Sequence, residues 1–534
     1  MKLQNRFCKK LISLLIKGKC LCLFGQCSLP TVNGDDLEYQ DMYTDTIPVD
    51  RNEKLAASQQ SNLVPCLLFM REHFECTNKN YIMKSLTKAL SEKWILLTTI
   101  SIFIFSACQK QIDQPSKQEE IVAKANNNIR GHLKQTNTYA SDIVVKWMDM
   151  QLRLMRTATG IPNNAFTRPY VYSGIALYES VAPGMPAYQS LEGQLNGLSG
   201  LPQTEHGFAY HWPSCANAAL AYINKNMFPT TSAANKTSID SLENALNTQY
   251  FNEENGEIIN RSIVFGKAVA QKIFEWAQTD GYLHASDAYA APTGEGLWTP
   301  TAPGFASAST PYWGNLRTIV SGSGNNAQPV APTLYSTDPS SDFYKMAKQV
   351  YDVSQLLTAE QTAMALYWRD VPGVTTPGHY VSILKQVLEN DKRMLDKAAI
   401  AYALSGIAAN DAAISCWQTK YHYNLVRPIT YIRNVLEHTT WNPLLTTPAH
   451  PEYSSAHAVL SAATAEVFSD LFGDNYSFTD HTYDYLGYAP RSFSSFKAFG
   501  IDAGNSRLYA GIHYQPSIDI GVEQGRKSGA EYYK

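Results

Sequence analysis

The sequence predicts an all-α fold, a helical bundle with a long irregular cap segment. From about residue 138, apolar residues recur at the three- and four-residue spacing of a helix, as in Ile143, Val144 and Trp147. We find no alternating strand pattern of any length. Charged residues make up 17% of the 534-residue chain and 32 residues are tyrosines, which favours a large, well-buried, aromatic-rich body.

The segment before this body differs from it in composition and pattern. Residues 1–82 hold six of the nine cysteines and keep no periodicity, so we interpret them as an upstream translation artefact or a disordered segment. Residues 83–108 run from basic to apolar residues and end in small residues before Cys108. This resembles a bacterial lipoprotein signal peptide, with translation starting at Met83 and Cys108 as the lipidated residue.

A transmembrane anchor is the alternative interpretation of this segment, but the apolar run from Trp94 to Phe105 is shorter than the about 20 residues of a span. Residues 109–137 are polar and predict a flexible tether. We therefore expect an exported bacterial lipoprotein, held by its lipid at a membrane in the periplasm or at the cell surface. The net charge of −3 gives no sign of a nucleic-acid partner, and a homo-oligomer stays open.

Residues 138–534 predict one helical domain. A Pro/Gly/Ser/Thr-rich segment at about 280–340 is too long for a simple connection, so we expect an ordered cap over the helical core. The helices that the periodicity predicts on either side of this cap are at about 255–278, 341–353, 358–370, 378–392, 394–427, 455–472, 491–508 and 516–531.

The first stretch with candidate chemistry ends in Lys420-x6-Arg427-Pro428. Pro428 is expected to stop the helix just past Arg427, which would deliver an ammonium and a guanidinium to one site. Taken alone, a solvated basic face is the better interpretation. At helical spacing, four residues share one side of this predicted helix: Trp417, Lys420, Asn424 and Arg427.

The second stretch runs from Pro448 to His457. Its two prolines block a helix before residue 452, and Ser454 or Ser455 is expected to cap the helix that follows. A helix start offers free N–H groups and a partial positive charge to an anion, and His457 in the first turn would face that anion. A plain N-cap with a surface histidine is the alternative.

The third stretch is Ser506-Arg507-x5-His513. Gly511 permits a tight bend that turns His513 back toward Arg507. Alone, a buried structural histidine would be the better interpretation. Together, the three stretches supply three cations, a hydroxyl, a helix start and two imidazoles, which is the set that a tetrahedral or trigonal-bipyramidal oxyanion needs.

This ordered triple pattern resembles the signature of the superfamily that joins type 2 phosphatidic acid phosphatases (PAP2) with vanadium-dependent haloperoxidases. Two positions depart from it, Ala456 where Gly is usual and Ser454 where Pro often stands. Ala456 keeps the backbone N–H that the family uses. The length of the body, its helical pattern and the stretch Pro311-Tyr312-Trp313-Gly314 resemble the haloperoxidase branch.

The resemblance implies vanadate as the cofactor and places six residues around it, five of them at its oxygens. Lys420, Arg427 and Arg507 would neutralise its oxygens, and Lys420 would have a catalytic role because it would polarise the bound peroxide most directly. Ser455 and the Ala456 N–H would hydrogen-bond it. Hydrogen peroxide and a halide are the implied partners, and the implied reaction gives a hypohalous species without a change in the oxidation state of vanadium.

The resemblance also assigns roles to the aromatic residues of the motifs. His513 would be the axial ligand of the metal, and His457 would assist proton transfer. Trp417 and His450 would shape the halide side. A histidine at position 450 resembles bromide-using members of the family, so bromide or iodide is the expected halide.

Two other functions remain open from the sequence. In a PAP2-type acid phosphatase, His513 would attack phosphorus to give a phosphohistidine, and His457 would protonate the leaving alcohol. However, the lipid phosphatases have several transmembrane spans, which are not evident after residue 108, and the small soluble ones are much shorter. A non-catalytic oxyanion-binding lipoprotein would predict a missing ionic motif residue, and none is missing.

Overall fold

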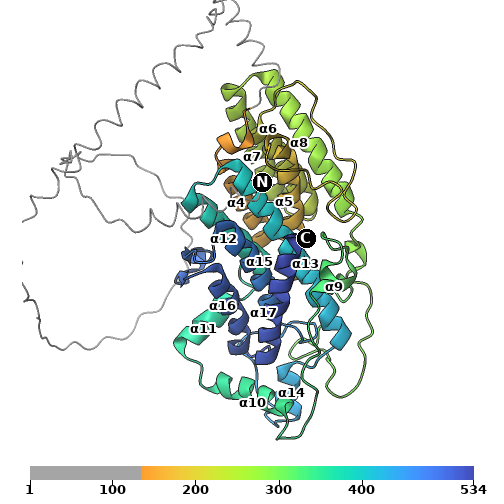
Figure 1. Cartoon of the computed structure of the whole chain (residues 1–534). Coiled ribbons are helices and arrows are strands. Elements are labelled where there is room, and N and C mark those ends of the chain that lie inside the picture. The colour runs from red at the N-terminus through yellow and green to blue at the C-terminus, as the bar shows by residue number, and fades with distance from the viewer. Residues whose placement is uncertain (1–133, 534) are drawn as a thin grey trace, which may run out of the picture. The chain divides into compact units, whose positions relative to one another are not determined.

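The structure, a computed structural model, describes residues 134–533 (Figure 1). The described part is helical apart from its loops and one pair of three-residue strands, so the all-α prediction is confirmed. The predicted segments 1–82 and 83–108, with Cys108, lie outside the described residues, as does nearly all of the predicted tether at 109–137.

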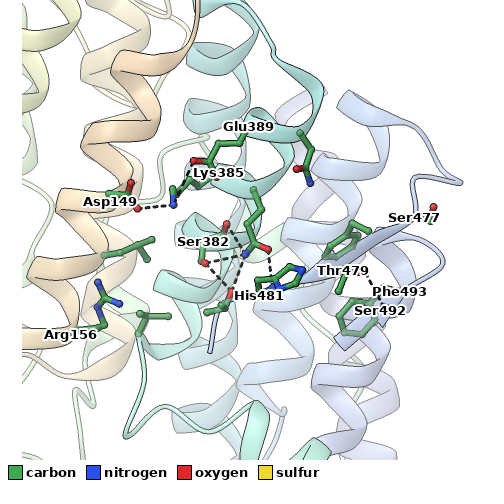
Figure 2. A pocket seen from close by; sticks show the side chains of 16 residues that line it. Asp149, Arg156, Ser382, Lys385, Glu389, Ser477, Thr479, His481, Ser492 and Phe493 are labelled. Carbon is green, nitrogen blue, oxygen red and sulfur yellow. Dashed lines mark hydrogen bonds and ion pairs between the residues drawn. The ribbon is translucent and has the colours of Figure 1, made fainter. Parts of the chain in front are cut away.

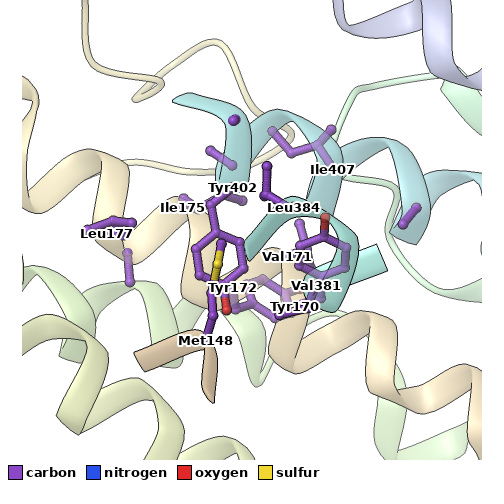
Figure 3. Close-up of a cluster of buried hydrophobic side chains, with 14 of the residues drawn as sticks. Met148, Tyr170, Val171, Tyr172, Ile175, Leu177, Val381, Leu384, Tyr402 and Ile407 are labelled. Atoms are coloured by element: carbon purple, nitrogen blue, oxygen red, sulfur yellow. The ribbon is translucent and has the colours of Figure 1, made fainter. Parts of the chain in front are cut away.

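The first half of the domain is a group of five helices. One of them, α5 (Thr167–Val181), is buried over its whole length. Side chains from α5 meet Tyr402 and Leu384 of later helices in a core that Figure 3 shows, and the hydroxyl of Tyr170 donates to Ser405 at 2.6 Å. The other four helices are α4 (Asp142–Thr157), α6 (Trp212–Met227), α7 (Ala233–Glu253) and α8 (Gly256–Ala277).

The 29-residue helix α13 (Leu395–Tyr423) is the centre of the domain and packs against α5 and against the last helices of the chain. By length and hydropathy alone it would suffice to cross a membrane. However, 94% of its most apolar window is buried by other parts of the chain, as in a core helix.

The prediction of one helix over 394–427 is wrong at its C-terminal end. Asn424 adopts the left-handed conformation (φ 47°) and ends α13, and its side chain donates to the Tyr421 carbonyl. Pro428 begins a new helix, α14 (Pro428–Asn434), because proline fits the first helical position, where its missing N–H has no partner to lose. Arg427 and Asn424 therefore do not share a helix face with Lys420.

The segment 280–340 is the ordered cap that the sequence predicts. It holds to α13 through the buried carboxylate of Asp411, which accepts hydrogen bonds from Ile319 N at 2.7 Å, Val320 N at 2.9 Å and Ser323 Oγ at 2.7 Å. Its regular elements are the short helices η4 (Tyr282–His284), η5 (Trp313–Asn315) and α9 (Ser323–Asn326).

After the cap, the chain forms the helices that surround the motif stretches. The predicted helix at 491–508 begins later than expected, because Ser495 caps it by accepting from Ala498 N and the residues before it form a strand. That strand, β2 (Arg491–Phe493), pairs antiparallel with β1 (Phe478–Asp480). The helices of this half are α10 (Asp342–Gln355), α11 (Ala359–Tyr367), α12 (Thr375–Asp391), α15 (Ala456–Phe472), α16 (Phe496–Tyr509) and α17 (Gln515–Ala530).

The remaining regular elements of the described residues are single turns of 3-10 helix. They are η1 (Thr136–Thr138), η2 (Asn163–Phe166), η3 (Ala182–Gly184), η6 (Asp484–Leu486) and η7 (Glu531–Tyr533).

Helices α15 and α17 make the closest helix contact of the second half, because α17 presents glycine every four residues to its neighbour. A Cβ on Gly521 would lie 2.9 Å from the Cβ of Ala458, and one on Gly529 would lie 2.6 Å from the carbonyl oxygen of Ala463. Between them, a Cβ on Gly525 would collide with the Val459 carbonyl. This contact fixes the position of the α15 N-terminus, where the second motif stretch ends.

Candidate active site

The three motif stretches meet at one cavity of about 750 Å³. Nine residues were predicted for the site. Three of them, Lys420, Arg427 and Ser455, are fully buried next to residues that line the cavity. The other six line the cavity itself: Trp417, His450, Ala456, His457, Arg507 and His513.

The guanidinium of Arg427 links the second and third stretches. Its Nε donates to the His450 carbonyl at 2.8 Å, and one terminal nitrogen donates to the Ile512 carbonyl at 2.9 Å. The same nitrogen lies 3.2 Å from Nε2 of His513. Burial lowers the pKa of Arg427 to about 10, so the group stays charged at neutral pH.

His513 is held as a neutral imidazole with a defined tautomer. Because arginine only donates, Nε2 of His513 accepts from Arg427, and the ring proton lies on Nδ1. Nδ1 then donates to the buried Glu452 carboxylate at 2.8 Å. Burial, with the charges of Arg427 and Lys420, holds the pKa of His513 well below its usual range. The unprotonated Nε2 therefore acts as a metal ligand or a nucleophile once its lone pair is released from Arg427.

Glu452 is a site residue that the motif analysis did not assign. Its two carboxylate oxygens also accept from Tyr514 N at 3.0 Å and Ser517 Oγ at 2.7 Å. The signal for it was present, since it is the one acidic residue of the second stretch. A carboxylate behind a ligating histidine orients the ring and raises its basicity.

The Lys420 ammonium is held by the second stretch itself. It donates to the carbonyl oxygens of Pro451 and Glu452 at 3.0 Å and of Ser454 at 2.6 Å, which uses its three N–H bonds. Burial lowers its pKa, and the Glu452 carboxylate acts against that change. Lys420 therefore shapes the loop and adds positive charge behind the cavity.

The start of α15 offers unpaired donors to an anion. Ser455 is the N-cap, yet its hydroxyl makes no capping bond and has no hydrogen-bond partner among the described residues, although it is buried. The N–H groups of Ala456 and His457, in the first turn, have no intrahelical acceptor. An orphaned hydroxyl beside a helix start and buried cations fits a bound oxyanion.

Arg507 completes the positive side of the cavity from the last turn of α16. Its Nε donates to Ser506 Oγ at 2.9 Å and a terminal nitrogen donates to the Ala365 carbonyl at 3.2 Å. Burial lowers its pKa to about 10, and the nearby Asp370 carboxylate opposes that shift. Like Arg427, it remains a cation at neutral pH.

His457 is held as a base rather than as an acid. Its Nε2 lies 2.8 Å from the Trp368 carbonyl, which only accepts, so Nε2 carries the proton and Nδ1 keeps its lone pair. Thr376 lies 3.0 Å from the same Nε2 and donates its own hydrogen to Asp370 at 2.8 Å. Burial and the charge of Arg507 lower the pKa of His457 to about 4. No motif or spacing pointed to Trp368, Thr376 or Asp370.

The rings of Trp417 and His450 lie next to each other in one wall of the cavity, with their centroids 5.1 Å apart. Nδ1 of His450 accepts from Arg427 at 2.9 Å, so its Nε2 carries the ring proton. Nε1 of Trp417 is buried without a hydrogen-bond partner among the described residues. The wall thus carries two N–H donors, a set that suits a small anion.

Within residues 134–533, no group of three or more His, Cys, Asp or Glu side chains is arranged to hold a metal ion. The cavity instead pairs one available imidazole nitrogen with cations and N–H donors. This set suits a metal that arrives as an oxyanion rather than as an aqueous cation.

A second cavity, of about 770 Å³, lies between α4, α12 and the β1–β2 pair (Figure 2). Its charged side chains pair with each other, as Lys385 does with Asp149 at 2.8 Å. Gln386 donates to Asp480 and accepts from His481 N. None of the nine predicted site residues lines it, so we assign the chemistry to the first cavity.

Comparisons with known proteins agree with this geometry. Residues 400–534 match the family described as the VCPO second helical-bundle domain. A bacterial vanadium-dependent iodoperoxidase of known structure is 33% identical with a TM-score of 0.68, over 74% of this chain and 96% of the other. No curated protein sequence matches the chain.

A bacterial vanadium-dependent chloroperoxidase shares the fold at lower identity. Its holo form is 16% identical with a TM-score of 0.55, over 70% of this chain and 92% of that one. Its apo form gives the same identity and TM-score, over 70% and 93% of the two chains.

The lowered pKa of His457 predicts acid sensitivity of the fold. The unfolded chain takes up this proton near pH 6.5 and the folded chain near pH 4, so stability is fully present above pH 6.5 and is lost as pH falls toward 4. The loss from this residue should reach about 3 kcal/mol.

We expect His457→Asn to flatten the decline of the free energy of unfolding in urea titrations between pH 7 and 4.5. An unchanged slope would contradict the assignment, and His284→Asn, at an exposed histidine, is the control.

Proposed function

This chain belongs to the family of vanadium-dependent haloperoxidases, and on that premise we propose that it oxidises iodide or bromide with hydrogen peroxide. The observation that supports this most is the neutral His513, whose unprotonated Nε2 lies among buried cations. Hydrogen peroxide, one halide and one proton give hypohalous acid and water. The halide loses two electrons and the peroxide bond accepts them.

Bound vanadate supplies an electrophilic centre at which peroxide becomes open to attack by a halide. His513 Nε2 would bind the metal, and Glu452 would keep that nitrogen unprotonated. The orphaned Ser455 hydroxyl fits an oxygen of the anion. The remaining residues that would hold the oxyanion by charge or hydrogen bonding are Lys420, Arg427, Arg507 and the Ala456 N–H.

His457 moves the proton in this proposal. Its Nδ1 lone pair would accept a proton from hydrogen peroxide as it enters, because the Trp368 carbonyl holds the other ring proton in place. The protonated His457 would later return this proton to the oxygen that leaves as water. Trp417 and His450 would hold the halide with their N–H groups.

Iodide is the first choice of halide. The iodoperoxidase in the comparisons is 33% identical to this chain, whereas the chloroperoxidase is 16% identical. The imidazole at His450 supports bromide as the second choice, since its N–H and its contact with Arg427 place a donor on the halide side.

Two substitutions should separate binding from turnover. We expect His513→Ala to abolish vanadate binding, because it removes the nitrogen that would bind the metal. We expect His457→Ala to keep vanadate while losing a factor of about 100 or more in turnover, since it removes a general base. Equilibrium dialysis with orthovanadate and vanadate-dependent triiodide formation by residues 109–534 measure the two properties.

These measurements, together with an assay of aryl phosphate hydrolysis, decide between the haloperoxidase and phosphatase activities of the superfamily. Tight vanadate binding by His513→Ala would show that the ligand assignment is wrong. Hydrolysis of an aryl phosphate by the vanadate-free protein, blocked by vanadate and without halide oxidation, would instead assign the chain to the phosphatases with His513 as the nucleophile.

Glu452→Gln should weaken vanadate binding about 10- to 100-fold, because the carboxylate that orients His513 and raises its basicity is lost. Glu523→Gln, at an exposed glutamate paired with Lys527, is the matched control and should bind vanadate as the wild type does. Equal dissociation constants for wild type and Glu452→Gln would remove Glu452 from the site.

We also propose that the enzyme is an exported lipoprotein anchored through Cys108. The basic, apolar and small-residue order of 83–108 supports this, as does the polar segment 109–137. Expressed from Met83 in a bacterial host, the wild type should fractionate with membranes and carry the mass of a lipid on Cys108. Cys108→Ser should lose that mass, and a wild-type protein without lipid would refute the proposal.

A further inference from the structure

The cavity is larger than halide oxidation requires. Orthovanadate, hydrogen peroxide and a halide ion are each only a few atoms in size, whereas the cavity measures about 750 Å³. Volumes of about 300–1,000 Å³ are those of pockets that enclose a small organic molecule. Space for such a molecule therefore remains beside the residues of the proposed reaction.

The mouth of the cavity is apolar, while its interior is cationic. Val371 and Leu444 line it with 71% and 41% of their surfaces exposed, and the partly buried Leu445 follows in sequence. Arg369 and Asp370 also line it, so these two wall residues carry opposite charges. An apolar ligand without net charge fits such a mouth better than an ion does.

One polar group on the wall has no partner. Thr447 lines the cavity with only 7% of its surface exposed, and its hydroxyl oxygen makes no hydrogen bond among the described residues. Buried hydroxyls are nearly always paired, and a hydroxyl both donates and accepts. Because Leu444 and Thr447 both line this cavity, one ligand would meet both with an apolar face and a hydroxyl.

We propose that this cavity binds a neutral hydroxyarene, which places the organic acceptor of the reaction next to the site of halide oxidation. The ring lies against Leu444 and Val371, and its hydroxyl pairs with Thr447. This inference rests on the proposed function for its chemistry. Hypohalous acid gives its halogen to a ring carbon, that carbon loses its proton, and the proton and hydroxide leave as water.

The test compares two reactions of the same vanadate-loaded protein, residues 109–534. Triiodide formation from iodide and peroxide needs no organic acceptor, so it measures halide oxidation alone. Iodination of 2-naphthol measures oxidation together with use of the acceptor. For every variant, the second rate is divided by the first.

In the wild type, the normalised iodination of 2-naphthol should saturate. Leu444→Asp should raise the KM for 2-naphthol about tenfold, because it places a charge where the ring packs. Thr447→Val keeps the shape and should raise the KM severalfold by removing the hydroxyl. Leu334→Asp, at a leucine that is 87% exposed and outside the cavity lining, is the matched control and should leave the ratio and the KM as in the wild type.

The same ratio and the same KM in all variants would overturn the inference, since an arene that meets free hypohalous acid in solution does not respond to residues of the cavity. Absence of triiodide in the wild type would instead refute the proposed function. Ligand-observed NMR of 2-naphthol with the vanadate-free protein then decides the acceptor site separately. Binding that Leu444→Asp and Thr447→Val weaken supports the site, and no binding overturns it.

Discussion

The buried carboxylate of Glu452 is the constraint on which the arrangement of this site depends. Arg427 and Lys420 bring two cations into the interior, and burying charge without a counter-charge costs several kcal/mol per ion. Glu452 supplies the opposite charge at 0% exposure and bonds to His513, Tyr514 N and Ser517. The second motif stretch is thereby joined to the third. One carboxylate offsets one of the two positive charges, sets the tautomer of His513 and holds the two loops together.

The fold could be predicted from the sequence wherever apolar periodicity was long. Helix α13 and most helices after the cap were found within about five residues of their observed ends, whereas α14 was not predicted. The errors lie where one residue's backbone overrides the pattern. Asn424 enters the left-handed region and ends α13, which the spacing of Lys420 and Arg427 does not signal. The strand Arg491–Phe493 is too short for an alternation of apolar and polar residues to reveal it in the sequence.

For the site, the motif residues were identified, but their neighbours were not. Spacing and resemblance placed all nine residues around one oxyanion. Six of them line one cavity, whereas Lys420, Arg427 and Ser455, expected to contact the anion, lie buried behind that lining. The partners that set protonation come from other elements. The Trp368 carbonyl and Thr376 hold the proton of His457 from positions about 80 to 90 residues before it. A backbone carbonyl carries no side-chain signature, so such a partner becomes visible only once the chain is folded.

The glycines of α17 extend the influence of the site to residues that no ligand touches. Gly521, Gly525 and Gly529 let α17 lie directly on α15, and the N-terminus of α15 carries Ser455 and Ala456. Any larger side chain at these glycines would push α15 outward and shift its first turn. In a directed-evolution library selected for activity, these three positions should therefore stay invariant while exposed positions on α17 drift freely. The tolerance of each α17 position to substitution would therefore depend on the anion site, although α17 does not line that site.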